Sequence, residues 1–200
     1  NIITFNQSDW RTKRKIAGGG ILLDQGIHIL DLLRLFAGDF NQIKSFVSNN
    51  YWKFDVEDNV YAVMKTRSGI HASINSSATQ WPHKFSLEIN LEKGSVVLSG
   101  ILSNSKSYGK ETIKFLKKKK NDNKFKQNIK IKKYTKDISW DKELESFSDI
   151  IKNKKSSKKG SISEAFLTMK LVFLIYYSDK EWRKKYNIEN PNKFTIDEEK

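Results

Sequence analysis

An aspartate, a histidine and a second aspartate follow three consecutive glycines in the segment GGGILLDQGIHILDLL. Asp24 and His28 are four residues apart and Asp31 follows three residues later, so all three would share one face of a helix. A carboxylate beside an imidazole orients the ring and favours its protonated form. Such a pair can serve as a general acid or base for a hydroxyl proton. The alternative is a hydrogen-bonded pair without a chemical role, and for Asp31 we favour a structural role.

The three glycines lie at the entrance of this predicted helix. Lacking side chains, Gly18, Gly19 and Gly20 would let the backbone approach a ligand closely and present unpaired N–H groups to it. Gly26 lies inside the predicted helix, where glycine costs about 1 kcal/mol relative to alanine. We therefore expect a close contact at Gly26 that excludes a side chain.

Two residues just ahead of the glycines are candidate substrate contacts. Tryptophans are rigid flat surfaces that can stack on a sugar ring, although they more often serve as core or interface. Trp10 and Arg11 occupy this position, and we select them as the side chains that contact a substrate. The spacing of His71 and His83 is not typical of a metal site, and we predict no metal.

A helix and a run of strands must position these residues. The apolar pattern predicts a helix from Gly20 to Phe36, closed by Gly38. Alternation of apolar and polar residues predicts strands at NIITFNQ, QIKSFVSN, VYAVMKT, IHASINSSATQ, KFSLEINLE, SVVLSG and NIKIKKYT. Two further helices are expected, one with an apolar face (Trp140, Leu144, Phe147 and Ile151) and one that begins at Ser161.

This order of elements predicts an α+β fold. Consecutive strands with short turns indicate a large, open, mainly antiparallel sheet, with the helices packed on one face. We expect a single substrate-binding and oligomerisation domain over residues 1–200, with a lysine-rich loop region at residues 103–133. An open sheet usually covers its apolar outer face with a second copy, so we expect a homo-oligomer, either a dimer or a tetramer.

The net charge of +14 comes mostly from one stretch of the chain. Residues 101–160 hold 19 basic and 7 acidic side chains, and these basic residues are all lysines. Because base recognition and bidentate phosphate contacts depend heavily on arginine, this composition favours a solvated surface over a nucleic-acid site. The absence of cysteine excludes disulfides and thiolate chemistry. We expect a cytoplasmic protein without a membrane partner.

The segment GGGILLDQGIHILDLLRLFAG resembles the GGG-x-L-x-D-x-G-x-H-x-x-D signature of the Gfo/Idh/MocA oxidoreductases, the family of glucose–fructose oxidoreductase and inositol dehydrogenase. DVEDNVYAVMKTRSGIHASINSSATQW is similar to the strand pair of that family after an acidic turn. LEINLEKGSVVLSG resembles its next hairpin, and SISEAFLTMKLVFLIYYSDKEW its closing helix. The resemblance covers about residues 1–186 and is loose between Leu102 and Tyr134.

In that family an N-terminal Rossmann domain binds NAD or NADP, and a C-terminal domain supplies the substrate pocket and the subunit contacts. This chain is similar to the second domain alone, because no Gly-x-Gly-x-x-Gly follows a strand and the family's Glu-Lys-Pro lysine has no counterpart. The resemblance therefore implies that the Rossmann domain is missing from this chain and that NAD or NADP binds mainly to that domain, and we assign no cofactor-binding residue in this chain.

The resemblance also implies the roles of the motif residues. Asp24 would orient the substrate and support the histidine, and His28 would be the general base that takes the hydroxyl proton as hydride leaves for the nicotinamide. Gly18, Gly19 and Gly20 would lie beside the ligand. We thus expect the substrate-binding and catalytic half of an NAD(P)-dependent dehydrogenase that oxidises a hydroxyl of a sugar, a polyol or a nucleotide-sugar and is inactive alone. The alternatives are a non-catalytic dimerisation scaffold and a lysine-rich polyanion-binding module.

Overall fold

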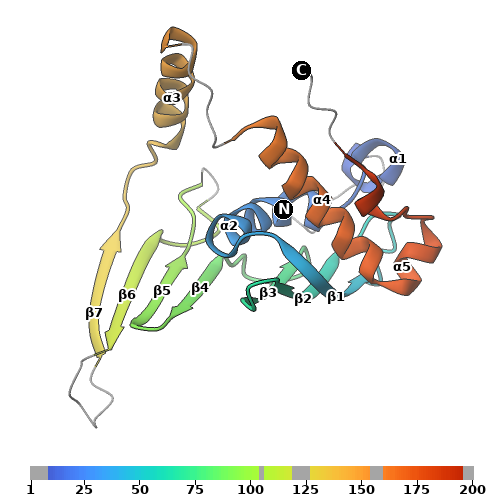
Figure 1. The fold of residues 1–200 in the computed structure, drawn as a ribbon, viewed down its shortest axis with the longest axis horizontal. Coiled ribbons are helices and arrows are strands. Elements are labelled where there is room, and N and C mark those ends of the chain that lie inside the picture. Colours follow the sequence, from blue (N-terminus) through green and yellow to red (C-terminus); the bar gives the residue numbers. More distant parts are fainter. Residues whose placement is uncertain (1–8, 104–105, 119–126, 154–159, 196–200) are drawn as a thin grey trace. The chain divides into compact units, whose positions relative to one another are not determined.

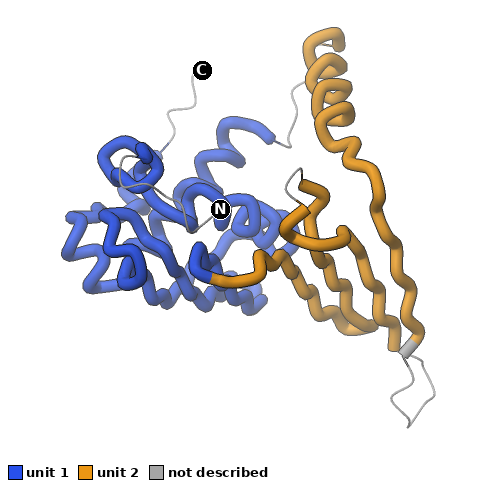
Figure 2. The backbone as a smooth tube through the Cα atoms, turned by 180° about the vertical axis from the view of Figure 1, so that it is seen from behind, with its two compact units in different colours: residues 1–79, 157–200 blue, residues 80–156 orange. Residues whose placement is uncertain are grey.

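The computed structural model describes residues 9–103, 106–118, 127–153 and 160–195. The chain falls into two compact units, which Figure 2 shows in separate colours. Unit 1 consists of residues 1–79 and 157–200, and unit 2 of residues 80–156. Both units combine antiparallel strands with helices, which confirms the predicted α+β fold class. The single domain over residues 1–200 stays a prediction.

Three antiparallel strands form the sheet of unit 1, in the order β1–β2–β3 (Figure 1). They are β1 (Phe40–Ser48), β2 (Asn59–Thr66) and β3 (His71–Ser77), and each lies where the alternation of residues predicts a strand. Alternate residues of β2 are buried, because successive side chains of a strand point to opposite faces. One face of the sheet therefore belongs to the core, and the other is exposed.

Helices cover the buried face of this sheet (Figure 1). Their fully buried side chains, which include Leu22, Leu30 and Tyr176, pack against Val60 and its neighbours in one hydrophobic core. The helical elements of unit 1 are η2 (Trp10–Thr12), α1 (Arg14–Ala17), η3 (Leu22–Gly26), α2 (Ile27–Ala37), α4 (Ile162–Ser178), α5 (Lys180–Lys185) and η4 (Pro191–Lys193).

The predicted helix around the glycine motif is confirmed, and its first turn is unusual. It begins with η3, a turn of π-helix that contains Asp24, and continues as α2. Short π-helical turns inside α-helices often occur at functional sites. Gly38 closes α2 as predicted: its φ is 81°, and its N–H donates to the carbonyl oxygen of Arg34 at 2.8 Å.

The helical stretch from Arg14 to Ala37, with 24 residues, is long and apolar enough to cross a membrane. The core helix of a water-soluble protein can pass the same test. Here Leu22 and Leu30 are fully buried in the core of unit 1. Composition alone therefore does not indicate a membrane.

Unit 2 contains a four-stranded antiparallel sheet in the order β4–β5–β6–β7. These strands are β4 (Ser86–Leu91), β5 (Gly94–Ser99), β6 (Thr112–Lys118) and β7 (Gln127–Lys133), and the helix α3 (Ser139–Asn153) follows them. The register pairs Leu87 with Leu98 and Leu98 with Ile113, so apolar side chains of three strands share one face.

The strands form two separate ladders in the described part of the chain, not the one large sheet that we expected. The ladder of unit 1 ends with β3, and that of unit 2 begins with β4. The connecting residues include Pro82, which has no N–H to donate to a ladder and therefore disfavours a continuous strand at this point. The strand expected at NIITFNQ lies outside the described residues.

The expected loop region at residues 103–133 is wrong where β6 lies within it, whereas β7 confirms the strand predicted at NIKIKKYT. The sequence of β6, TIKFLKK, has four apolar or β-branched residues among three lysines and is a weak strand signal alone. Pairing with β5 stabilises it, since Val96 lies opposite Phe115 and Leu98 opposite Ile113.

A buried arginine joins α2 to α4. One guanidinium nitrogen of Arg34 donates to Thr168 Oγ1 at 2.7 Å and to the carbonyl oxygen of Glu164 at 3.1 Å. The other two nitrogens lie 3.0 Å from an Asp39 carboxylate oxygen and 3.3 Å from a Glu164 carboxylate oxygen. Thr168 donates to Asp31 at 2.8 Å, so Asp31 belongs to this network and has the structural role that we favour.

Arg34→Ala is expected to lower the free energy of unfolding by about 2 kcal/mol, because it leaves Thr168 without its buried donor while the exposed carboxylates regain water. Denaturant titration measures the loss. The exposed Arg67 provides the control, and Arg67→Ala should change stability by less than about 0.5 kcal/mol. Equal losses for both variants would show that the network does not stabilise the fold.

Candidate functional site

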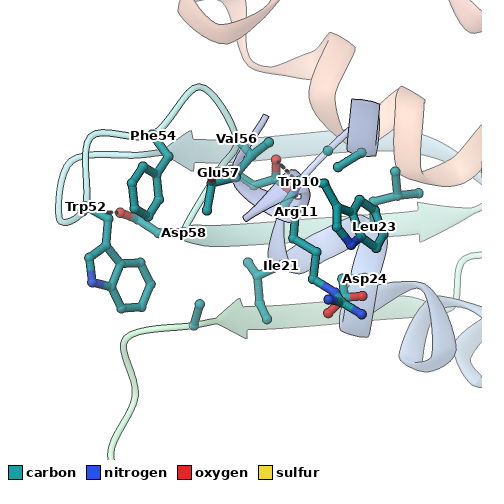
Figure 3. A pocket seen from close by; sticks show the side chains of 15 residues that line it. Trp10, Arg11, Ile21, Leu23, Asp24, Trp52, Phe54, Val56, Glu57 and Asp58 are labelled. Carbon is teal, nitrogen blue, oxygen red and sulfur yellow. Dashed lines mark hydrogen bonds between the residues drawn. The ribbon is translucent and has the colours of Figure 1, made fainter. Parts of the chain in front are cut away.

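Unit 1 contains a cavity of about 200 Å³ beside the glycine turn (Figure 3). Five residues that the sequence selects line it: Trp10, Arg11, Gly19, Gly20 and Asp24. They come from η2, from the turn before η3 and from η3 itself. The fold thus brings the two predicted substrate contacts to the same wall as the first acid of the motif.

The opposite end of the cavity comes from the loop between β1 and β2. Trp52 and Phe54 extend from this loop, and Val56 follows them toward β2 (Figure 3). The lining is mainly apolar and aromatic, with a few polar groups. This combination is typical of pockets that bind small molecules. Sequence reasoning did not select Trp52 as a substrate contact, and it missed Phe54.

Two predicted site residues do not line the cavity. Gly18 is exposed at the end of α1, and His28 lies exposed on α2, one turn beyond Asp24. The carboxylate of Asp24 is also exposed and accepts a hydrogen bond from Gln25 Nε2 at 3.1 Å. Within the described residues no hydrogen bond joins Asp24 to His28, so the alternative of a mutually satisfied pair does not hold in this structure.

The expectation that the glycines present free N–H groups to a ligand is wrong for two of them. The N–H of Gly18 donates to the carbonyl oxygen of Arg14 at 2.7 Å, which closes α1. The N–H of Gly20 donates to Glu57 Oε2 at 2.8 Å. These donors are used inside the protein, because a buried backbone N–H without a partner is costly.

The glycines are required because protein atoms approach them closely. A Cβ on Gly20 would overlap the backbone carbonyl of Glu57, and one on Gly19 would lie 2.5 Å from the hydroxyl oxygen of Tyr176. The contact expected at Gly26 is also present, since a Cβ there would lie 2.9 Å from Ser76 Oγ on β3. The motif glycines therefore serve packing within unit 1 first, and the ligand site depends on that packing.

Glu57 is the central residue that sequence reasoning missed. Its side chain is only 2% exposed, and its carboxylate accepts hydrogen bonds from Gly20 N–H (2.8 Å), Leu22 N–H (3.0 Å) and the Tyr176 hydroxyl (2.6 Å). Burial raises the pKa of Glu57, and these hydrogen bonds offset part of that rise. The available signal was the acidic pair Glu57 and Asp58 in the turn just before the strand predicted at VYAVMKT.

Asp58 holds the aromatic loop in place. Its carboxylate accepts hydrogen bonds from Tyr51 N–H at 2.9 Å and from Trp52 N–H at 3.2 Å. The edge of Tyr51 packs against Trp52, with the ring centroids 5.1 Å apart. The side-chain amide of Asn49 donates to the carbonyl oxygen of Phe54. The two aromatic side chains at this end of the cavity are therefore supported by hydrogen bonds to their own loop.

The histidines outside the motif do not gather around the cavity. His71 lies exposed on β3, and His83 in unit 2 packs against Trp81 and Tyr108, with ring centroids 6.0 and 5.4 Å apart. Among the described residues, no three histidine, aspartate or glutamate side chains lie close enough to hold a metal ion.

The comparison of the sequence with protein families assigns the part of the chain that builds this site. Residues 3–97 match the GFO/IDH/MocA C-terminal domain. The match covers 95 of the 200 residues, so it assigns this part of the chain. The matched residues include the whole glycine motif with Asp24 and His28, the aromatic loop and Glu57. The predicted resemblance is thus confirmed where its motif lies.

Solved structures share the fold of the chain. An aldose-aldose oxidoreductase from Caulobacter crescentus, complexed with glycerol, is 19% identical with a TM-score of 0.71, over 88% of this chain and 50% of that one. Levoglucosan dehydrogenase in complex with NADH and levoglucosan is 17% identical with a TM-score of 0.68, over 86% and 52%. The WlbA dehydrogenase from Bordetella pertussis, in complex with NADH and UDP-GlcNAcA, is 19% identical with a TM-score of 0.65, over 90% and 49%.

These identities are low, so the likeness to the solved structures shows the fold. The chain spans about half the length of each of these three proteins. The GFO/IDH/MocA assignment therefore describes the part that is present here, a mixed α/β domain with antiparallel sheets.

Gly20→Ala is expected to destabilise the protein by about 3 kcal/mol or more, because the new methyl group meets the backbone of Glu57 and cannot be accommodated by a side-chain rotation. Gly69→Ala is the control: its φ is +91°, but the space around it is open, so about 1 kcal/mol is expected. Thermal unfolding compares the two. Equal losses would contradict the close approach of Gly20 to Glu57.

The raised pKa of Glu57 predicts a pH dependence of stability. Above pH 4.5, the ordinary pKa of the group, the unfolded chain loses this proton while the folded protein keeps it until the raised pKa is reached. The free energy of unfolding should therefore fall as the pH rises through this window. Glu57→Gln has no proton to lose and should lack this component in denaturant titrations at several pH values. An unchanged slope in Glu57→Gln would show that another group carries it.

Proposed function

We propose that this chain is the substrate-binding and catalytic half of an NAD(P)-dependent dehydrogenase that oxidises a hydroxyl group of a sugar, a polyol or a nucleotide-sugar. The observation that carries the proposal is the cavity, where Asp24, Gly19 and Gly20 of the family motif meet Trp10 and Arg11. The similar solved structures are named as oxidoreductases or dehydrogenases, and two of them are complexes with NADH.

The lining of the cavity suits a sugar. Trp10, Trp52 and Phe54 offer flat apolar faces to the C–H groups of a ring. Arg11 donates hydrogen bonds, and the carboxylate of Asp24 accepts them from hydroxyl groups. Because Glu57 and Asp58 are fully used by protein donors, Arg11 and Asp24 are the charged groups that orient the ligand.

In the proposed reaction His28 takes the proton of the reacting hydroxyl. It lies one helical turn beyond Asp24 and is exposed, so its ring is accessible to a substrate that extends from the cavity. In this proposal Asp24 orients the substrate for His28. Both residues lie on one continuous helix, which fixes their spacing.

The described residues do not fit a dinucleotide. Their strands pair only in antiparallel ladders, whereas a dinucleotide site uses parallel strands with a glycine-rich turn that leads into a helix. In our proposal NAD or NADP binds mainly to a Rossmann domain outside residues 1–200, and hydride acceptance takes place there. The part performed by this chain is to bind the substrate, orient it and accept the proton.

A second copy of the chain is the other partner that we propose. The outer face of the unit 1 sheet exposes Phe46, Tyr61 and Val63, with exposed fractions of 79%, 51% and 59%. The register aligns Phe46 with Tyr61, so these side chains are neighbours across β1 and β2. Exposed apolar side chains that cluster on a sheet are typical of subunit contacts.

His28→Ala is expected to lower the turnover of the assembled enzyme, this chain together with its Rossmann domain, by roughly 10²–10⁴-fold, the usual effect of removing a general base. Asp24→Asn should also lower turnover, while cofactor affinity stays nearly unchanged in both variants. His71→Ala, at an exposed histidine on β3, is the control and should keep full activity. If His28→Ala keeps wild-type turnover at neutral pH, the catalytic assignment of His28 is wrong, and the chain is better described as a non-catalytic scaffold.

Val63→Lys is expected to weaken self-association, because it places a charge among the exposed apolar side chains of the outer sheet face. Light scattering at micromolar concentration should show at least a dimer for the wild type and a shift toward monomer for the variant. Leu35→Lys, at an equally exposed leucine on α2, should leave the assembly unchanged. A monomeric wild type would exclude the proposed assembly.

A further inference from the structure

We propose that Tyr176 and Arg14 are positioning residues for the cavity, which act through Glu57 on the glycine turn and on Asp24. The inference rests on the proposed function for its activity measurements, but its structural measurements do not need that function. Neither Tyr176 nor Arg14 lines the cavity, so any effect on ligand binding must pass through other residues.

The first step of this relay runs from α4 to Glu57. Tyr176 is fully buried, and its hydroxyl donates to Glu57 Oε1 at 2.6 Å. Burial and the nearby Glu57 carboxylate raise the pKa of Tyr176 well above its usual value, so the phenol keeps the proton that it donates. The hydroxyl therefore fixes the position of one oxygen of a buried carboxylate.

The second step runs from Glu57 to the acid of the motif. The same Oε1 accepts the N–H of Leu22, while Oε2 accepts the N–H of Gly20. The backbone carbonyl of Glu57 accepts the N–H of Ile21 at 3.2 Å, and the carbonyl of Gly20 accepts the N–H of Asp24 at 2.9 Å. Three consecutive backbone donors thus bind one glutamate, and the next turn places Asp24 at the cavity wall.

Arg14 links the same tyrosine to the other side of the cavity. Its guanidinium carbon lies 5.4 Å from the ring centroid of Tyr176, 5.7 Å from that of Trp182 and 4.4 Å from that of Tyr186. One guanidinium nitrogen is buried and has no hydrogen-bond partner among the described residues, so the aromatic faces are what stabilise its charge.

Backbone hydrogen bonds near Arg14 connect it to the segments that form the cavity walls. Its N–H donates to an Asp55 carboxylate oxygen at 2.8 Å, in the loop that presents Trp52 and Phe54. Arg14 also follows Trp10 and Arg11 by a few residues, and the carbonyl of Trp10 accepts the N–H of Lys13 at 3.1 Å. Tyr176 thus contacts both groups that hold the cavity walls, the carboxylate on one side and the guanidinium on the other.

The decisive variant is Tyr176→Phe, which removes the hydroxyl and keeps the ring that stacks on Arg14 and packs against Phe173. Tyr186→Phe is the matched control, because Tyr186 also stacks on Arg14 but donates no hydrogen bond to Glu57. Arg14→Met tests the second contact, since it keeps an extended apolar stem and removes the charge.

The first measurement is amide hydrogen exchange by NMR on the chain. In Tyr176→Phe the N–H groups of Gly20 and Leu22 should exchange at least about tenfold faster than in the wild type, whereas Tyr186→Phe should leave both rates unchanged. Unchanged protection of Gly20 and Leu22 in Tyr176→Phe, or equal acceleration in Tyr186→Phe, would overturn the inference.

The second measurement is the steady-state kinetics of the assembled enzyme. Tyr176→Phe and Arg14→Met should lower kcat/KM by about tenfold or more, because a displaced Asp24 or aromatic side chain no longer orients the substrate. Tyr186→Phe should keep the wild-type kcat/KM. The melting temperatures of all three variants are compared, so that a loss of stability is separated from a loss of orientation. Wild-type kcat and KM in a folded Tyr176→Phe protein would overturn the positioning role. An inactive wild-type enzyme would overturn the proposed function instead, and the exchange rates would still decide the relay.

Discussion

The carboxylate of Glu57 lies almost without solvent in unit 1, and a buried charge must find hydrogen bonds inside the protein. It finds them in two backbone N–H groups of the glycine turn and in the hydroxyl of Tyr176. This requirement explains why Gly20 has no side chain, since the turn can reach Glu57 only if its backbone approaches directly. The same contact fixes where the helix with Asp24 begins. The cavity therefore depends on one acid, Glu57, which lines it and whose carboxylate oxygens already accept hydrogen bonds from the protein.

Segments far apart in the sequence build the site through such contacts. The turn around Gly20, the loop before β2 and the helix α4 meet at Glu57, although Tyr176 lies 119 residues further along the chain. A second set of bonds, from Arg34 to Thr168 and from Thr168 to Asp31, attaches α2 to the same helix. Because α4 supports both ends of the motif helix, substitutions in α4 can alter a site that they do not touch.

Among the described residues, none of the lysine-rich stretch 101–160 lines the cavity. All residues that line the cavity belong to unit 1, whereas residues 101–160 carry most of the excess positive charge. Six of the described lysines of this stretch lie on β6 and β7, and those on the edge strand β7 disfavour pairing with a further strand. The family match ends at residue 97, near the point where this composition begins.

The sequence by itself determined the class of the fold, the helix with Asp24 and His28, most of the strands and the family, because helix periodicity, alternation and glycine spacing are local patterns. It also selected Trp10, Arg11 and Asp24, which the cavity brings together. Only the tertiary structure revealed Glu57, because a carboxylate becomes important here through burial and through donors that lie 35 to 119 residues away in the chain. The strand β6 was also recognised only in the structure. Its three lysines make the strand pattern weak in the sequence, and its pairing with β5 stabilises it. The use of the glycine N–H groups was likewise decided by the fold, because a hydrogen bond to a distant side chain leaves no trace in local spacing.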